Sequence, residues 1–126
     1  MLRWILLTMF VAQASDFKPV ADTRQLMYAM VIPASDFMFN LPFEVPSDDE
    51  GWDLVENNAV LLAESGNLLL MRADGRQPWG EASRALIDAG EATLMAARAR
   101  DVDRISELAE DILAPCSGCH DLYLVP

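Results

Sequence analysis

Apolar residues recur at intervals of three and four along most of this chain, which is the spacing of one face of an α-helix. The pattern extends over four stretches, and no β-hairpin signal separates them. Amphipathic helices bury their apolar faces against one another when there is no sheet to cover. The sequence therefore predicts an all-α fold, an antiparallel four-helix bundle.

The first predicted helix covers residues 22–39 and contains a proline. Asp22 or Thr23 is the predicted N-cap, because either side chain offers an oxygen to the backbone donors of the first turn. Pro33 lacks a backbone donor, and its ring presses on the preceding turn. We therefore expect a kink or a break near Ile32.

Three further helices are predicted after a proline-containing linker. The second covers about 47–71, where Ser47 and Glu50 have the spacing of a capping box. The third covers about 79–99 and carries a stripe of small residues that permits close helix approach. The fourth begins near Asp101, which can cap it, and leads into the last residues of the chain.

The first residues resemble a secretory signal peptide. Arg3 is followed by an apolar run over residues 4–12, and residues 12–14 read Ala-Gln-Ala, the small-residue pattern of a cleavage site. The apolar run is shorter than the roughly 20 residues that span a bilayer, which disfavours a membrane anchor. We expect residues 1–14 to be removed and residues 15–126 to form one periplasmic domain, without stable membrane insertion.

The chain is acidic, with 20 Asp and Glu residues against 9 Lys and Arg residues and a formal net charge of −11. Loss of Arg3 with the signal peptide would make the charge more negative by one. Such a protein is repelled by nucleic-acid phosphates, so no nucleic-acid partner is expected. The charge favours a partner protein with a basic docking surface, although solubility alone would also explain it.

The only two cysteines and the only histidine of the chain stand within five positions, Cys116-Ser117-Gly118-Cys119-His120. The form C-x-x-C-H is the attachment sequence for a c-type haem. Two thiols at this spacing add to the two vinyl groups of the porphyrin, and the adjacent imidazole reaches the iron. The motif predicts Cys116 and Cys119 as attachment residues for one haem c and His120 as an iron ligand.

Three other interpretations of the motif remain. A thioredoxin-like dithiol belongs at the start of a helix in a βαβ context, whereas this motif follows helical patterns only. A structural zinc site needs four ligands, and only three candidates lie nearby. A simple disulfide leaves the adjacent histidine without a role.

An export signal followed by a four-helix pattern with C-x-x-C-H in its last turns resembles the class II cytochromes c. These comprise cytochrome c prime and its low-spin, methionine-ligated relatives. The specific segments are DTRQLM in the first predicted helix and CSGCHDLYL at the end of the chain. Family members commonly read C-x-x-C-H-x-x-Tyr, which Tyr123 matches, and commonly place a basic residue next, where this chain has Leu124. The resemblance implies an exported one-electron carrier rather than an enzyme.

The resemblance also implies roles for residues of the first helix. Arg24-Gln25 matches a polar pair that lies near the haem propionates in the family, and a guanidinium suits a carboxylate. Aligned on the Leu-Met of the methionine-ligated branch, Met27 is the sixth iron ligand. Counted from the Arg-Gln pair, the matching residue is Tyr28. Met30 lies on nearly the same helix face as Met27 and is a further candidate.

The identity of the sixth ligand separates two functions. With His120 and Met27 both bound, the iron stays low-spin and suits electron transfer to a redox partner. With an open face, the resemblance implies a five-coordinate haem protein that binds nitric oxide or carbon monoxide in sequestration or sensing. A haem-free helical interaction module is the third hypothesis. Family members often form dimers, so a homodimer is also among the expectations.

Overall fold

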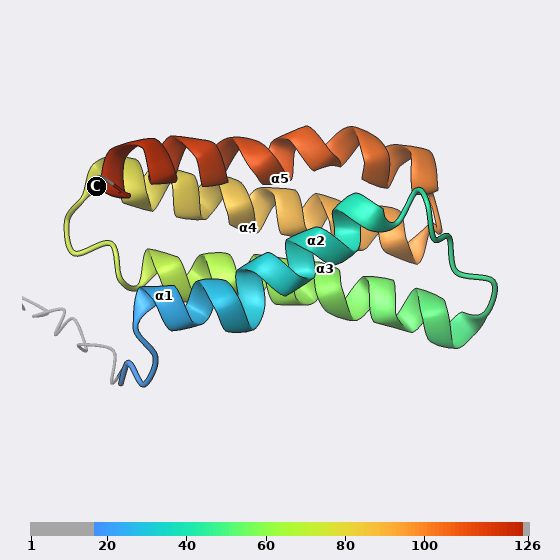
Figure 1. Cartoon of the computed structure of the whole chain (residues 1–126), viewed down its shortest axis with the longest axis horizontal. Coiled ribbons are helices and arrows are strands. Elements are labelled where there is room, and N and C mark those ends of the chain that lie inside the picture. Colours follow the sequence, from blue (N-terminus) through green and yellow to red (C-terminus); the bar gives the residue numbers. More distant parts are fainter. Residues whose placement is uncertain (1–16, 125–126) are drawn as a thin grey trace, which may run out of the picture.

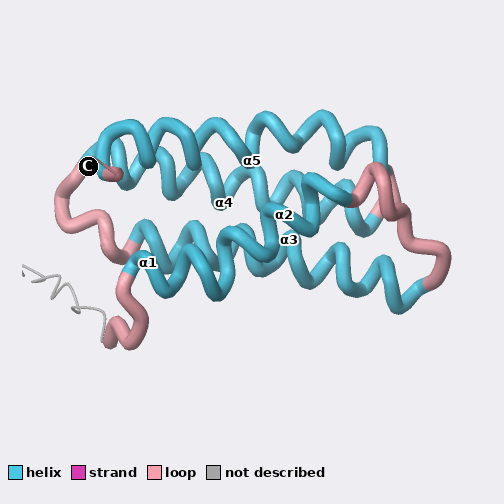
Figure 2. The backbone as a smooth tube through the Cα atoms, in the orientation of Figure 1, coloured by secondary structure: helices cyan, strands magenta, loops and turns pink. Residues whose placement is uncertain are grey.

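Residues 17–124 are described by a computed structural model, and the predicted signal peptide, residues 1–14, lies outside them. The regular elements of the described residues are all helical (Figures 1 and 2). They are α1 (Thr23–Leu26), the π-helical turn η1 (Met27–Val31), α2 (Ile32–Asn40), α3 (Asp49–Leu70), α4 (Gln77–Arg98) and α5 (Val102–Tyr123). The predicted all-α class is confirmed.

The elements form four packed rods, because α1, η1 and α2 follow one another as a single irregular helix (Figure 1). Successive rods run in opposite directions in this view. Helix α3 packs along α4, α4 packs along α5, and α2 contacts both α3 and α5. Four helices therefore pack against each other, as a helical bundle requires. No helix within residues 17–124 is long and apolar enough to cross a membrane.

The starts of the first two rods are fixed by aspartates. Asp22 caps α1, as predicted, and its carboxylate accepts a hydrogen bond of 2.7 Å from the Gln25 amide. The cap of α3 is Asp48, which accepts from the Gly51 amide at 2.8 Å, so the prediction that Ser47 caps this helix was wrong. Both residue types are good caps, but the charged carboxylate of Asp48 also interacts favourably with the positive end of the helix dipole.

The last two helices agree with the predicted ranges except at the start of α4. Helix α4 begins at Gln77, two residues before the predicted range of 79–99. Pro78 lies in its first turn, where the missing backbone donor is not needed. Asp101 caps α5, as predicted, and this helix continues through the C-x-x-C-H motif to Tyr123.

The irregularity predicted near Pro33 is present, and its form is a π-helical turn. The amide of Ile32 donates to the carbonyl of Met27, five residues earlier, instead of four. Pro33 itself lies in the first turn of α2. The disruption thus falls on the residues just before the proline.

Helices α3 and α4 approach closely at two glycines. A Cβ atom added to Gly90 would lie 2.6 Å from the backbone nitrogen of Ala63, and one added to Gly66 would lie 3.0 Å from the backbone nitrogen of Ile87. Non-bonded contacts of real Cβ atoms essentially never fall below 3.0 Å, a limit that the contact at Gly90 breaks and the backbone contact at Gly66 just reaches. The close helix contact is therefore made at Gly66 and Gly90, neither of which belongs to the stripe of small residues predicted along the third helix.

We expect Gly90→Ala to destabilise the protein. Alanine is the better helix former by about 0.5–1 kcal/mol, but the new methyl group meets backbone atoms of Ala63 that cannot rotate away. Overpacking of this kind costs roughly 1–3 kcal/mol, so the net change should lower the melting temperature by several degrees. Thermal unfolding followed by circular dichroism measures it.

Gly80→Ala is the matched control in the same helix. The nearest atoms to a Cβ there are the guanidinium end of Arg84 at 3.3 Å and a Leu70 methyl at 3.8 Å. Both can move, so this variant should be neutral or slightly stabilised. A Gly90→Ala protein as stable as the Gly80→Ala protein would contradict the close approach of α3 and α4.

Candidate functional site

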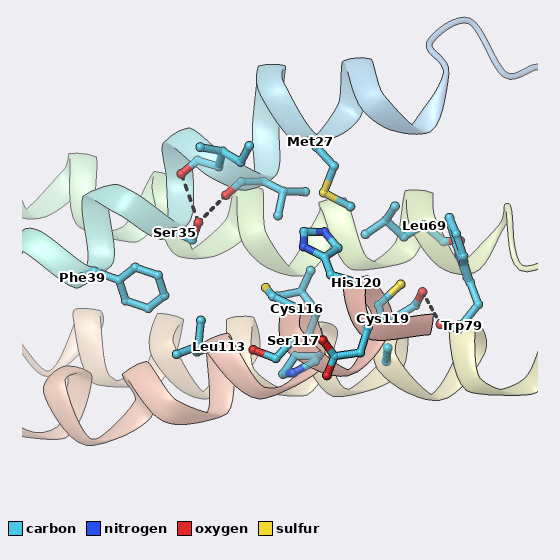
Figure 3. A pocket seen from close by; sticks show the side chains of 17 residues that line it. Met27, Ser35, Phe39, Leu69, Trp79, Leu113, Cys116, Ser117, Cys119 and His120 are labelled. Atoms are coloured by element: carbon cyan, nitrogen blue, oxygen red, sulfur yellow. Dashed lines mark hydrogen bonds between the residues drawn. The ribbon is translucent and has the colours of Figure 1, made fainter. Parts of the chain in front are cut away.

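A cavity of about 420 Å³ lies among η1, α2, α4 and the last turns of α5 (Figure 3). Its wall is mainly apolar and includes Val31, Phe39, Leu69, Leu86 and Leu113. Cavities of this size and lining are typical of small-molecule and cofactor sites. The cavity is therefore the natural place to look for the function of the C-x-x-C-H motif.

The three motif side chains share one wall of this cavity. Cys116, Cys119 and His120 are spaced i, i+3 and i+4 on α5, and residues with this spacing lie on one helix face. All three line the cavity. Gly118, between the cysteines, has no atom within 4 Å of its Cβ position, so it lies on the open side of the helix.

A proline precedes the motif without ending the helix. Pro115 lies inside α5, and its missing N–H removes the helical donor to the carbonyl of Asp111. The next residue, Cys116, is bonded locally, because its Sγ donates to the carbonyl of Ile112 at 3.3 Å. The motif residues therefore keep regular α-helical spacing.

The chemistry of the thiols is set by their partial burial. Burial raises the pKa of the Cys116 and Cys119 thiols above their usual value, and the positive charge of Arg76 opposes this rise at Cys119. Both groups are therefore protonated thiols at neutral pH. A redox-active C-x-x-C pair instead requires a lowered thiol pKa, so the thioredoxin-like interpretation is not favoured.

The cysteines are free in this structure. Within residues 17–124, no group of three or more His, Cys, Asp or Glu side chains is placed to hold a metal ion.

The opposite wall of the cavity carries Met27. Its thioether points toward the imidazole of His120 in Figure 3, and both residues line the cavity. Tyr28 is 64 % exposed and lines only an adjoining cavity, which Met27 and His120 also line. Met30 packs against the hydrophobic core, as Met27 also does, but it lines neither cavity. Of the three candidate sixth ligands, Met27 is the one that faces His120.

A second cavity, of about 730 Å³, adjoins the first and shares Met27, Cys119 and His120 with it. Its remaining lining is more polar and includes Arg24 and Arg76. The two cavities together give an apolar interior next to a rim that carries arginines.

The predicted polar pair is divided by the fold. Arg24 lines the second cavity, and its guanidinium lies 5.6 Å from the centre of the Tyr28 ring. Gln25 lines neither cavity, because its side-chain oxygen accepts a hydrogen bond of 2.9 Å from the Asp22 amide and completes a capping box. The structure therefore brings Arg24 to the site together with the motif and Met27, and places Gln25 in the helix cap.

Arg76, which no sequence pattern indicated as a site residue, is held over two aromatic rings. Its guanidinium carbon lies 4.0 Å from the centre of the Trp79 ring and 5.3 Å from that of Tyr123. Trp79 is fixed in turn, because its indole N–H donates to the carbonyl of Leu69 at 2.7 Å. Arg76 and Tyr123 are far apart in sequence, so no local pattern could have placed this arginine beside the motif.

Compared with protein-family models, curated proteins and solved structures, this chain gives no match. The resemblance to class II cytochromes c therefore remains a prediction, carried by two short segments of the sequence.

Proposed function

We propose that this protein is an exported monohaem c-type cytochrome of class II and carries single electrons. One observation carries the proposal: Cys116, Cys119 and His120 lie on one helix face at an apolar cavity, and Met27 faces them from the opposite wall. The C-x-x-C-H spacing needs this arrangement, since both thiols and the imidazole must reach the same cofactor.

The described residues fit a covalent haem. Free thiols, rather than a disulfide, are the form that attachment would need, because adding S–H across a vinyl group would give the sulfur to one carbon and the hydrogen to the other without an oxidant. Cys116 and Cys119 are such thiols. The apolar lining suits the faces of a macrocycle, because it removes apolar surface from water.

The haem would supply a reversible one-electron change at its iron. His120 and Met27 would hold the metal from two sides, and a His/Met pair raises the reduction potential. The two residues belong to different helices that pack in one bundle. Such a scaffold limits their movement when the charge at the centre changes, which suits an electron carrier rather than an enzyme.

The arginines at the cavity would receive the carboxylates of the haem. Three ion pairs occur within residues 17–124, and all three join side chains near the other end of the bundle: Arg98–Glu56, Arg100–Asp49 and Arg104–Glu107. No such pair within residues 17–124 involves Arg24 or Arg76. Their charges are therefore available for the propionates, and charge-assisted hydrogen bonds to a carboxylate are strong. Arg76 already donates from Nε to the carbonyl of Ala73 and from Nη2 to the carbonyl of Arg72, so its Nη1 group is the donor best placed for a propionate.

We expect Arg76→Gln to lower the reduction potential. A cation near the iron disfavours the more positive oxidised state, so its loss favours oxidation. A change of roughly 20–60 mV corresponds to about 0.5–1.4 kcal/mol for one electron, a reasonable value for one partly exposed charge. Arg98→Gln, far from the cavity, is the control. Spectroelectrochemical titrations measure the reduction potentials. Equal reduction potentials for the two variants would show that Arg76 does not lie near the haem iron.

The function is tested by producing the protein together with a cytochrome c maturation system. We expect a haem that survives acid–acetone extraction and a reduced spectrum with a sharp low-spin α band that carbon monoxide does not change. A high-spin spectrum that shifts with carbon monoxide would favour the gas-binding alternative. Complete extraction of the haem, or none incorporated, would refute both.

The remaining parts of the proposal follow from charge and from the first residues of the chain. We propose a periplasmic location after removal of residues 1–14, and a redox partner protein with a basic docking surface for this acidic protein. A homodimer is the oligomeric state that the family resemblance suggests. Sedimentation of the mature protein and the salt dependence of its electron-transfer rate test the last two points.

A further inference from the structure

The π-helical turn η1 inserts one extra residue into the first rod of the bundle. The amide of Ile32 bonds to the carbonyl of Met27, five positions earlier, whereas an α-helix uses a step of four. Each residue of an α-helix turns the chain by about 100°. One extra residue therefore changes which side chains on the two sides of the turn share a face.

Side chains that share a face across η1 are five residues apart. Leu26 and Val31 are both buried in the core, at 5 % and 4 % exposure. Met27 and Ile32 both line the two cavities at the motif. In an uninterrupted α-helix anchored at Val31, the spacing would be four. Met27 would then point into the core, and Tyr28 would take its place at the cavity.

Pro33 disfavours the uninterrupted helix. In a regular α-helix its ring would collide with the carbonyl of Ala29, and its missing donor would leave that carbonyl unpaired. In the structure Pro33 is the second residue of α2 and directly follows the π-helical turn, so the segment before it is not a regular α-helix. The junction is held by Ser35, whose buried hydroxyl donates to the carbonyls of Val31 at 2.8 Å and Ile32 at 3.0 Å.

We infer that Pro33 is a positioning residue that selects Met27 rather than Tyr28 to face His120, by way of the π-helical turn. The register is a property of the polypeptide alone. Its meaning for iron ligation rests on the proposed function. The two alignments of the first helix differ by one residue, which is the length of this insertion.

Nuclear Overhauser effects in the haem-free protein test the register directly. With methyl-labelled methionine, wild-type protein should show contacts between the Met27 methyl group and the His120 ring. Pro33→Ala should lose most of their intensity and gain contacts from the Tyr28 ring to His120. Pro78→Ala removes a proline from the first turn of α4 and serves as the control, with the wild-type pattern expected.

A deletion provides the rescue. Without Ala29, both Leu26 to Val31 and Met27 to Ile32 become four residues apart, so a regular α-helix keeps the native faces. The deletion combined with Pro33→Ala should therefore show the Met27 to His120 contacts. The deletion alone keeps Pro33, whose ring would meet the carbonyl of Tyr28 in a regular α-helix, so it should lose these contacts. Circular dichroism should show helical protein in the combined variant, which tests the register even if Pro33→Ala alone fails to fold.

The outcomes separate the inference from the proposed function. Three results would overturn the inference: stronger contacts to His120 from Tyr28 than from Met27 in the wild-type protein, undiminished Met27 contacts in Pro33→Ala, or no Met27 contacts in the deletion combined with Pro33→Ala. In matured protein, Pro33→Ala should show a high-spin, carbon-monoxide-binding fraction that the added deletion removes. If the contacts behave as expected but no covalent haem forms, the register stands and the proposed function falls.

Discussion

Replacing Cys116 and Cys119 together by serine will abolish covalent haem attachment. The two thiols lie on the cavity face of α5, and the chain has no other cysteine to replace them. Serine keeps the size and helical tolerance of the site, but its hydroxyl is a far weaker nucleophile than a thiol. Acid–acetone extraction should release essentially all haem from the double variant and none from the wild type.

Single replacements refine this result. Cys116→Ser and Cys119→Ser should each keep one thioether, so that haem still resists extraction but its α band shifts toward longer wavelength. Ser117→Ala, between the cysteines, is the matched control and should mature normally. Covalent haem in the double serine variant would exclude the C-x-x-C-H motif as the attachment site.

Met27→Ala will convert a low-spin haem into a high-spin haem that binds carbon monoxide. Met27 is the candidate side chain that faces His120 across the cavity, and alanine has no atom that can bind iron. Loss of a thioether ligand should also lower the reduction potential by on the order of 100 mV, since a His/Met pair raises it. Absorption spectra with and without carbon monoxide, and a redox titration, measure both effects.

Tyr28→Phe and Met30→Leu are the controls for this prediction. Tyr28 is largely exposed, and Met30 packs against the core, so neither change should alter the spin state. A low-spin spectrum in Met27→Ala together with a high-spin spectrum in Met30→Leu would assign the ligand to Met30. A wild-type protein that is already high-spin would support the gas-binding alternative.

The helices were predictable because their signals are local. Capping aspartates, the three-and-four spacing and the small residues of the third helix act within a few residues of one another. The error of one residue at Ser47 and Asp48 arose because two good caps are adjacent. Pro33 predicted the place of the irregularity in the first rod, but not that it would be a π-helical turn.

The candidate site was predictable only where its residues share one helix. The C-x-x-C-H motif was evident from the sequence, and its spacing places Cys116, Cys119 and His120 on one face because α5 continues through it as a regular helix. Only the tertiary structure placed Arg76 beside them and engaged Gln25 in a helix cap. These arrangements depend on which helices pack together.

The choice between Met27 and Tyr28 likewise depended partly on the sequence and partly on the tertiary structure. The family resemblance named Met27, Tyr28 and Met30 as candidates to meet the motif, whereas the local sequence predicted only a helix with an irregularity near Pro33. Only the tertiary structure decided for Met27. Leu26 and Val31 are both buried in the core, and the π-helical turn accommodates one extra residue between them. Met27, next to Leu26, therefore lies on the side of the helix that meets the motif. The physical reason is that helix phase is set by packing against other helices, which no local pattern contains.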